Sequence, residues 1–172
     1  LKEADPRLSR VAVLWNSAAP PHGSRAKQVE VAARSLGVQV QPVEVRNPGD
    51  FEGAFSAITQ QRANGLLVTE DLTFLVRRGE IALFALKVRL PTISSFREFA
   101  HAGGLMTYGP NGSDLFRRAA TFVGKILKGA NPAVLPVEEP VQYELIINLS
   151  TAKALGLRVP QSILLRADQV VE

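Results

Sequence analysis

The chain has no cysteine among its 172 residues, and its two histidines, His22 and His101, lie far apart in the sequence. The absence of thiols excludes disulfides, a cysteine nucleophile and a cysteine-ligated zinc site. Neither histidine has a nucleophile or carboxylate at a telling spacing, so we treat both as non-catalytic. No apolar run approaches the roughly 18 residues that span a bilayer. We therefore expect no metal, no cofactor and no transmembrane helix.

Motifs of common α/β enzymes are also missing. The sequence contains no G-x-x-x-x-G-K-[ST] phosphate loop, no G-x-G-x-x-G after the first strand and no G-x-S-x-G elbow. A phospho-receiver domain needs paired acids after the first strand and a lysine after the fifth, where this chain has Asn16 and Tyr108. These absences argue against an enzyme and against a receiver domain.

Positive charge exceeds negative charge, with a net charge of +4 at pH 7. A basic chain raises the question of nucleic-acid binding. The basic residues are scattered, in pairs such as Arg77–Arg78 and Arg117–Arg118, on segments that we expect to be helical. No stacking aromatics are interleaved with them. We interpret them as solvated helix faces and predict no nucleic-acid partner.

Apolar runs alternate with helical periodicity in units of about 30 residues. Strands are expected at 11–15, 38–43, 66–68, 91–94, 105–108 and 143–147, the second at a sheet edge because it contains Pro42. Helices are expected at 24–36, 51–63, from Thr73 to Val88, and at 96–102, 114–127 and 150–155. This alternation predicts right-handed βαβ crossovers and an α/β fold with a doubly wound, mainly parallel sheet.

Local signals refine several of these elements. Pro20 and Pro21 indicate a loop after the first strand, and Asp50 is a suitable N-cap for the helix that follows it. Ser113 and Gly129 are expected to bound the 114–127 helix, whose apolar stripe comprises Phe116, Ala119, Ala120 and Val123. The stretch 130–140 is expected to be extended, and the chain after 155 to be a tail with one last turn.

Candidate ligand residues follow from the rule that open α/β sheets bind ligands beyond the carboxyl ends of their strands. The hydrogen-bonding and aromatic groups expected there are Asn16, Ser17, Asp71, Ser95, Glu98 and Tyr108. They suit a small polar ligand. Structural explanations stay open: Asp71 as a helix cap, Glu98 as a solvated residue paired with Arg97, and Tyr108 as a loop anchor. Trp15 fits core filling better than ligand contact.

Several segments resemble one protein family. They are LSRVAVLWN (8–16), SFREF (95–99), GGLMTYG (103–109), FRRAA (116–120), KILKGA (125–130), ELIINL (144–149), TAKALGL (151–157) and LRAD (165–168). Together, over essentially the whole chain, they resemble the solute-binding proteins of bacterial ABC importers. The group in question includes tryptophan- and tyrosine-type binders.

The resemblance implies a type 1 periplasmic-binding-protein fold, in which two α/β lobes close on a ligand like a hinge. This chain would be the second, C-terminal lobe, formed by residues 1–107 and 138–172. Residues 108–137 would cross the hinge and carry a helix that packs with the first lobe. Residues 1–4 resemble the end of a helix that begins upstream. In an isolated fragment, the 114–127 helix could be exchanged between two chains, giving a dimer.

The same resemblance implies a non-catalytic component of an import system that binds a small polar solute, such as an amino acid. Its partners would be that ligand and an ABC transporter permease in the membrane. Its location would be periplasmic, or extracellular and membrane-associated, with the signal peptide outside this chain. Ser17-Ala18-Ala19-Pro20 and Glu70-Asp71-Leu72 depart from the family's usual ligand loops, so the solute does not carry over.

Two other classes of function stay open. One is the effector-binding sensor domain of a regulator with the same two-lobe fold, which an upstream helix-turn-helix would indicate. The other is an α/β enzyme with an unrecognised site, which turnover abolished by Asp71→Ala would reveal.

Overall fold

The computed structural model describes residues 1–18 and 22–172, with the backbone alone for 22–26. Pro20 and Pro21, expected in a loop, lie outside the described residues. Seven strands form one sheet in the order β2-β1-β3-β4-β5-β6-β7. The strands are β1 (Arg10–Trp15), β2 (Gln39–Glu44), β3 (Gly65–Val68), β4 (Thr92–Ser94), β5 (Met106–Pro110), β6 (Tyr143–Asn148) and β7 (Gln169–Val171).

All neighbouring strands run parallel except β5 and β6, which are antiparallel. The predicted doubly wound, mainly parallel α/β sheet is therefore confirmed. The strand that contains Pro42 lies at an edge, as expected for a residue that cannot donate a backbone hydrogen bond.

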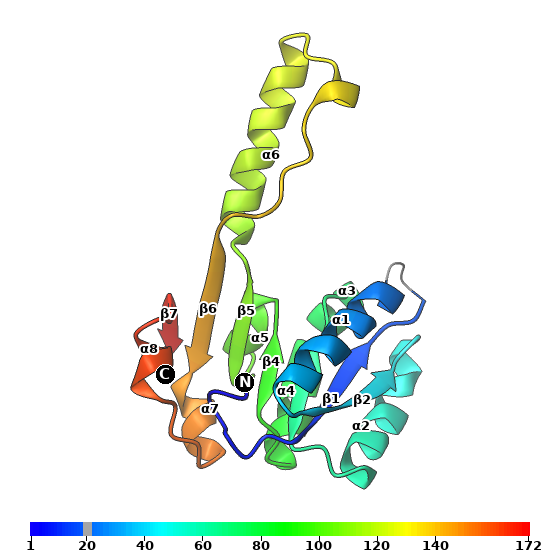
Figure 1. The fold of residues 1–172 in the computed structure, drawn as a ribbon, viewed down its shortest axis with the longest axis vertical. Helices are drawn as coiled ribbons and strands as arrows, with labels where there is room; N and C mark the ends of the chain where they lie inside the picture. The colour runs from blue at the N-terminus through cyan, green and yellow to red at the C-terminus, as the bar shows by residue number, and fades with distance from the viewer. Residues whose placement is uncertain (19–21) are drawn as a thin grey trace.

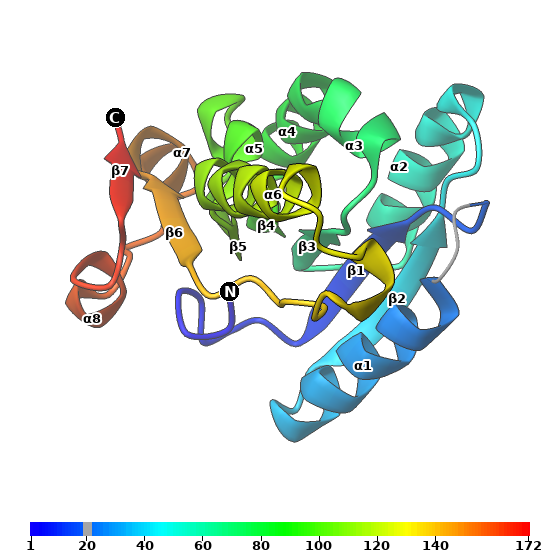
Figure 2. The same ribbon diagram turned by 90° about the horizontal axis from the view of Figure 1, so that it is seen from above.

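Helices and coil cover both faces of the sheet (Figures 1 and 2). One face carries α2 (Phe51–Gln60), α3 (Leu72–Val76), α4 (Arg78–Lys87), α5 (Arg97–His101) and α7 (Leu149–Ala154). The opposite face carries α1 (His22–Ser35), residues 1–9 and α8 (Gln161–Leu164). Two short 3₁₀ turns, Pro48–Asp50 and Pro132–Val134, complete the secondary structure of the described residues.

Aromatic packing under α2, α3 and α4 holds the strand ends in place. The Phe51 ring meets the edge of the Phe74 ring with centroids 6.0 Å apart, and Phe55 stacks on Phe84 at 4.0 Å. Offset or edge-to-face pairs of this kind add about 0.5–1.5 kcal/mol to the area that they bury. A second apolar cluster, around Ile147 between β5, β6 and α8, anchors the other half of the sheet.

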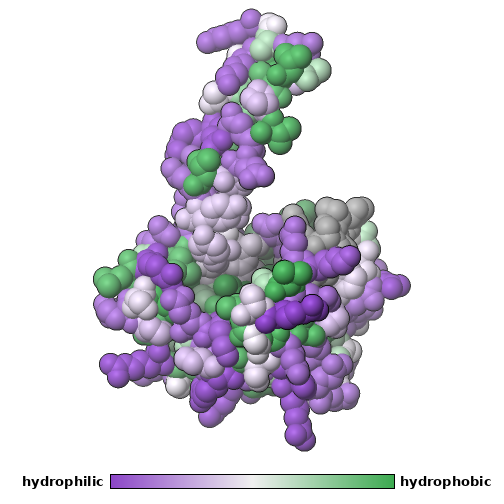
Figure 3. Space-filling model, viewed as in Figure 1, coloured by the Kyte–Doolittle hydropathy of each residue, from purple (hydrophilic) through white to green (hydrophobic). Residues whose placement is uncertain are grey.

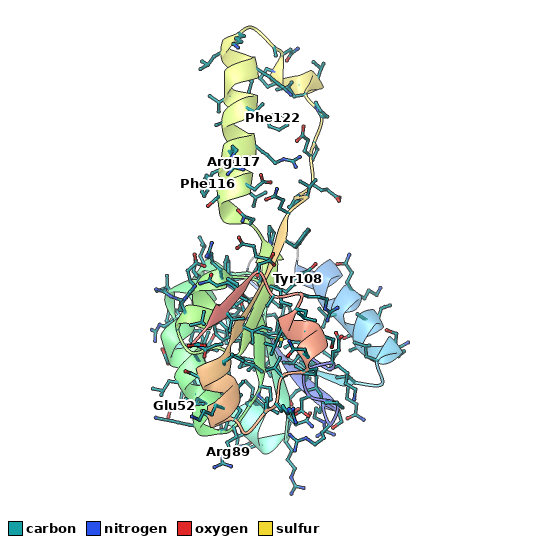
Figure 4. All side chains as sticks on the ribbon, turned by 90° about the vertical axis from the view of Figure 1, so that its left-hand side faces the viewer. Glu52, Arg89, Tyr108, Phe116, Arg117 and Phe122 are labelled. Atoms are coloured by element: carbon teal, nitrogen blue, oxygen red, sulfur yellow. The ribbon has the colours of Figure 1, made fainter. Side chains whose placement is uncertain are left out.

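One part of the chain stands away from the sheet. The helix α6 (Gly112–Leu127) and the returning segment 128–142 project from the ends of β5 and β6 (Figure 1). We call residues 112–142 the arm and the rest of the chain the body. Phe122 lies on the side of α6 that faces the returning segment, whereas Phe116 lies on the opposite side (Figure 4).

The outward side of the arm is apolar. Phe116 is 80% exposed, and Val123 and Leu127 on the same helix are also exposed. The space-filling view, which is seen from another side, shows further apolar residues of the arm among hydrophilic ones (Figure 3). Exposed apolar patches bordered by polar residues are typical of interaction surfaces, because apolar area gains about 25 cal/mol per Å² when it leaves water.

Two local expectations about helices were wrong. The helix expected from Thr73 to Val88 is two helices, because Arg77 leaves the helical conformation and the Arg78 guanidinium donates to the Leu75 carbonyl (2.8 Å) at the end of α3. The N-cap of α6 is Asn111, whose side-chain oxygen accepts from the Asp114 N–H (2.8 Å), and not Ser113. Gly129 does follow α6 with a positive φ of 97°, as expected for the C′ residue.

Asp50 occupies the N-cap position of α2, as expected, but its side chain makes no capping hydrogen bond there. Its carboxylate instead accepts the N–H groups of Arg46 (2.8 Å) and Asn47 (2.9 Å) and closes the turn before α2. The C-terminal tail differs from expectation. The tail ends in a strand, β7, that we did not predict. Asp168 docks it on β6, because the carboxylate accepts from the Leu145 N–H (2.8 Å) and the Asp168 N–H donates to the Leu145 carbonyl (2.9 Å).

Candidate functional site

The carboxyl ends of β1 and β3 bring two predicted site residues together. These strands pair in register, and Asn16 and Asp71 follow them. The Asn16 side-chain amide donates to the Asp71 carboxylate (3.0 Å), and its oxygen accepts from the Ala18 N–H (2.9 Å). Asn16 is buried. Residues 55 positions apart in sequence thus form one fixed polar pair.

Asp71 is also the N-cap of α3. Its other carboxylate oxygen accepts from the Thr73 N–H at 2.7 Å, so the structural explanation for this residue holds. A carboxylate offers about four acceptor positions. The contacts from Asn16 and Thr73 use two of them. They orient the carboxylate and leave acceptor capacity for a ligand donor.

Ser17 is engaged with the edge of the sheet. Its hydroxyl accepts from the Arg46 guanidinium (3.0 Å), which also contacts the Glu44 carboxylate (2.7 Å). The hydrogen bond from Arg46, and secondarily one from Ser17, lower the pKa of Glu44 below its usual value. The guanidinium therefore connects the loop after β1 to the end of β2.

A hollow of about 470 Å³ lies between α1 and the ends of the central strands. Its lining contains two of the predicted residues, Ser95 and Tyr108. The other residues that line it are Gln28, Val29, Ala32, Leu67, Val68, Thr69, Glu70, Ile93 and Ser94. The sequence does not indicate that Val29 and Ala32 belong to this lining, because helical periodicity does not show which strand ends a helix will lie over.

Buried hydroxyls at this place have no hydrogen-bond partner. Among the described residues, the hydroxyl oxygens of Ser94, Ser95 and Thr107 are buried and unpartnered, and Ser94 and Thr107 are paired in register on β4 and β5. Burying a hydroxyl without a partner costs about 1–3 kcal/mol. Ser94 and Ser95 line the hollow.

Gly109 allows β5 to lie directly against Ser95. A Cβ at Gly109 would stand 2.0 Å from the Ser95 carbonyl oxygen, a distance that no side chain tolerates. The close approach depends on a residue without a side chain. It fixes the position of Ser95 relative to Tyr108, which precedes Gly109.

Tyr108 is 56% exposed and lies where the arm meets the body (Figure 4). Its ring stacks on Tyr143 with centroids 5.6 Å apart. It also borders a second hollow of about 460 Å³, which shares Ile93 with the first and includes Leu145 and Arg166. Tyr108 therefore contributes an exposed aromatic face to both hollows.

Glu98 is exposed in the first turn of α5 and is not part of the lining of the 470 Å³ hollow. The expected pairing of Glu98 with Arg97 is wrong: the Arg97 guanidinium instead approaches Glu144 (3.5 Å) and donates to Gln169 (3.1 Å). Trp15 is partly buried, and its indole N–H is buried without a partner in the described part of the chain.

Within residues 1–18 and 22–172, the side chains described include no cluster of three or more His, Cys, Asp or Glu that could hold a metal ion. His101 is exposed, and the side chain of His22 lies outside the described residues. None of the described helices combines the length and the apolar character needed to cross a membrane.

Comparison with known proteins gives the fold a context. No curated protein matches the chain. A conserved domain protein from Vibrio cholerae superposes with a TM-score of 0.91 at 21% identity. The ABC domain from Streptococcus pneumoniae, in complex with L-Trp, superposes with a TM-score of 0.92 at 22% sequence identity. A substrate binding protein with adhesive properties from Clostridium difficile, in its ligand-free, open structure, superposes with a TM-score of 0.73 at 20% sequence identity.

These structures cover 98–99% of this chain, and the chain spans 57% of the length of each. At such identities the likeness shows the fold. A family model described as "ABC transporter substrate binding protein" matches residues 1–171. Because that match extends over nearly every residue, the chain belongs to the ABC transporter substrate binding protein family.

Proposed function

We propose that this chain is one lobe of a two-lobed receptor that binds a small polar solute, such as an amino acid, for import by an ABC transporter. The observation that carries the proposal is the hollow at the strand ends, whose lining residues include Ser94 and Ser95, two residues with buried, unpartnered hydroxyls. The fixed Asp71 carboxylate follows the same strand ends. A solute with donor and acceptor groups would satisfy them.

Each predicted residue has a role in this proposal. Asp71 and Glu98 would accept hydrogen bonds from a ligand amine. Asn16 and Ser17 would hold the loop beside Asp71 and offer an amide and a hydroxyl. Ser95 would hydrogen-bond the solute, and Tyr108 would cover its apolar part near the hinge. No step of covalent chemistry is needed, because binding alone performs the task.

Closure requires a second lobe, which we propose packs against the arm. Residues 1–107 and 138–172 would form this lobe, while 108–137 would cross the hinge and place α6 against the other lobe. The exposed stripe of Phe116, Val123 and Leu127 supports this, since it has the apolar character of a packing surface. A solute that touches both lobes only when they are closed would shift the equilibrium toward the closed state.

The setting of this function is part of the same proposal. An ABC permease in the membrane would receive the solute. The receptor would work in the periplasm, or outside the cell in association with the membrane. The family to which the chain belongs supports both statements. L-Trp is the first probe to try, because the similar structure from Streptococcus pneumoniae contains it.

The test is calorimetric titration of the proposed complete two-lobed protein with L-Trp and then with each other common amino acid. We expect one of them to bind, and Asp71→Asn to weaken that binding about 10- to 100-fold, since a hydrogen bond to a charged group is worth about 1.5–3 kcal/mol. Asparagine is also a good N-cap, so α3 should persist in this variant. Glu52→Gln is the matched control, because Glu52 is exposed at the far end of the body from Tyr108 (Figure 4).

Binding that is unchanged in Asp71→Asn would contradict the role of Asp71. If no amino acid binds, the solute is not an amino acid. If, in addition, native mass spectrometry detects no small molecule bound to the purified protein, the proposal of a solute receptor is contradicted.

A further inference from the structure

The arm is joined to the body by two neighbouring stretches of chain. β5 and β6 pair in antiparallel register up to Pro110 opposite Tyr143, and the Asn111 N–H continues the ladder by donating to the Gln142 carbonyl (2.9 Å). The first turn of α6 begins at the next residue. The arm therefore leaves the body where Asn111 and Gln142 face each other.

Glu144 contacts this junction from the body. One oxygen of its carboxylate accepts a hydrogen bond from the side-chain amide of Asn111. The side-chain oxygen of the same Asn111 caps α6 by accepting a hydrogen bond from the Asp114 N–H (2.8 Å). The orientation of the first turn of α6 thus depends on a side chain that Glu144 holds.

The second oxygen of Glu144 points to the body. It lies 3.5 Å from the Arg97 guanidinium, which donates in turn to Gln169 on β7 (3.1 Å). The Glu144 side chain is 21% exposed and that of Arg97 is 44% exposed. One carboxylate therefore bridges α5 and the cap of α6.

We propose that Glu144 is the positioning residue of the hinge: by linking Asn111 to Arg97 it sets the direction of the arm relative to the body. Two features connect this link to the site. Arg97 is two residues beyond Ser95 in the chain, and Tyr143, next to Glu144, stacks on Tyr108. If the proposed function holds, the same link sets how far the two lobes stand apart before a solute arrives.

Distances between spin labels test this directly, because the chain has no native cysteine. One pair, Glu52→Cys and Thr121→Cys, spans the body and the arm. A second pair, Glu52→Cys and Lys87→Cys, lies within the body. All three positions are exposed. Pulsed EPR on each doubly labelled protein, without solute, reports the arm and the body separately.

We expect the arm pair to show one narrow distance distribution, and Glu144→Ala to broaden or shift it while the body pair stays unchanged. Glu144→Gln keeps an acceptor for Asn111 and loses the charge toward Arg97, so it should cause a smaller change. In high salt, the distance distribution of the arm pair in the parent should become more like that of Glu144→Gln, because ~1 M salt reduces the screening length to about 3 Å and weakens the attraction between Glu144 and Arg97.

The control is Glu3→Ala, which removes an ion pair with Arg166 that is 59% exposed on both sides and lies outside the hinge. It should leave the arm distribution unchanged. The proposal is overturned if Glu144→Ala leaves the arm pair as in the parent, or if Glu3→Ala broadens it equally. Because no solute is present, neither result depends on whether an amino acid binds.

Discussion

Replacement of Gly109 by alanine tests the closest backbone approach at the site. The added Cβ would lie 2.0 Å from the Ser95 carbonyl oxygen and 2.8 Å from its carbonyl carbon. Nonbonded carbon and oxygen atoms rarely approach closer than about 3.3 Å, so the two segments would have to separate by about 1 Å. Both partners are backbone, and no side-chain rotation relieves the contact.

The expected cost is that of overpacking, about 1–3 kcal/mol of the free energy of unfolding. For a chain of this size each kcal/mol lowers the melting temperature by about 2–4 °C, so we expect a decrease of about 2–12 °C. Thermal and urea unfolding followed by circular dichroism measure it. Solute affinity should fall as well, because the displaced segment carries Ser95 and adjoins Tyr108.

Gly124→Ala is the matched control. Gly124 lies inside α6, and a Cβ there would meet nothing within 4 Å. Alanine is favoured over glycine in a helix by about 0.5–1 kcal/mol, so this variant should be slightly more stable than the parent. A Gly109→Ala protein as stable as the parent would refute the steric reasoning at Ser95.

Four further predictions concern burial, surface exposure, capping and charge. Ile147→Ala, at a fully buried position, should cost about 2–5 kcal/mol in urea unfolding. Phe116→Ser should change stability by less than about 0.5 kcal/mol and, if α6 is exchanged between two chains, should abolish the dimer in light scattering. Asp71→Ala should cost about 0.5–2 kcal/mol through the lost cap of α3. A hydrogen bond from Arg7 lowers the pKa of Asp5 in the folded protein. The ionised Asp5 therefore stabilises the fold at pH values above its unfolded-state pKa of about 3.9. This contribution to the free energy of unfolding is lost as the pH falls through the lower folded-state pKa. Asp5→Asn should therefore be less stable than the parent at neutral pH, and urea unfolding at decreasing pH should show this difference disappear as Asp5 becomes protonated in the folded protein.

The parallel sheet could be predicted because its strands are short, continuous apolar runs, a pattern that arises when both faces are covered. Val11 to Trp15 is such a run, and Pro42 correctly indicated an edge. β7 escaped prediction because its three residues show no alternation. Its position depends on Asp168, which pairs with a backbone group 23 residues earlier, and no local pattern encodes that contact.

The sequence predicted which strand ends would carry the candidate site, but not the contacts of its individual side chains. Adjacent parallel strands bring their carboxyl ends to one edge, which is why Asn16 and Asp71 meet. The partners of individual side chains were not predictable from sequence neighbours. Arg97 and Glu98 are consecutive on a helix and so point in different directions. Arg97 reaches instead to a carboxylate 47 positions away, which only the packing of α5 beside β6 could reveal.

The two explanations for Asp71, helix cap and ligand acceptor, reinforce each other. A free carboxylate on a loop would lose rotamer freedom on binding, a loss of about 0.5–1.5 kcal/mol for a flexible side chain. Asp71 has already lost that freedom in folding, because Thr73 and Asn16 hold one oxygen each. A ligand amine would thus meet an acceptor whose direction is set before it arrives. If Asp71 binds the ligand as proposed, the cap would contribute to affinity without touching the ligand, since it removes an entropic cost that binding would otherwise include.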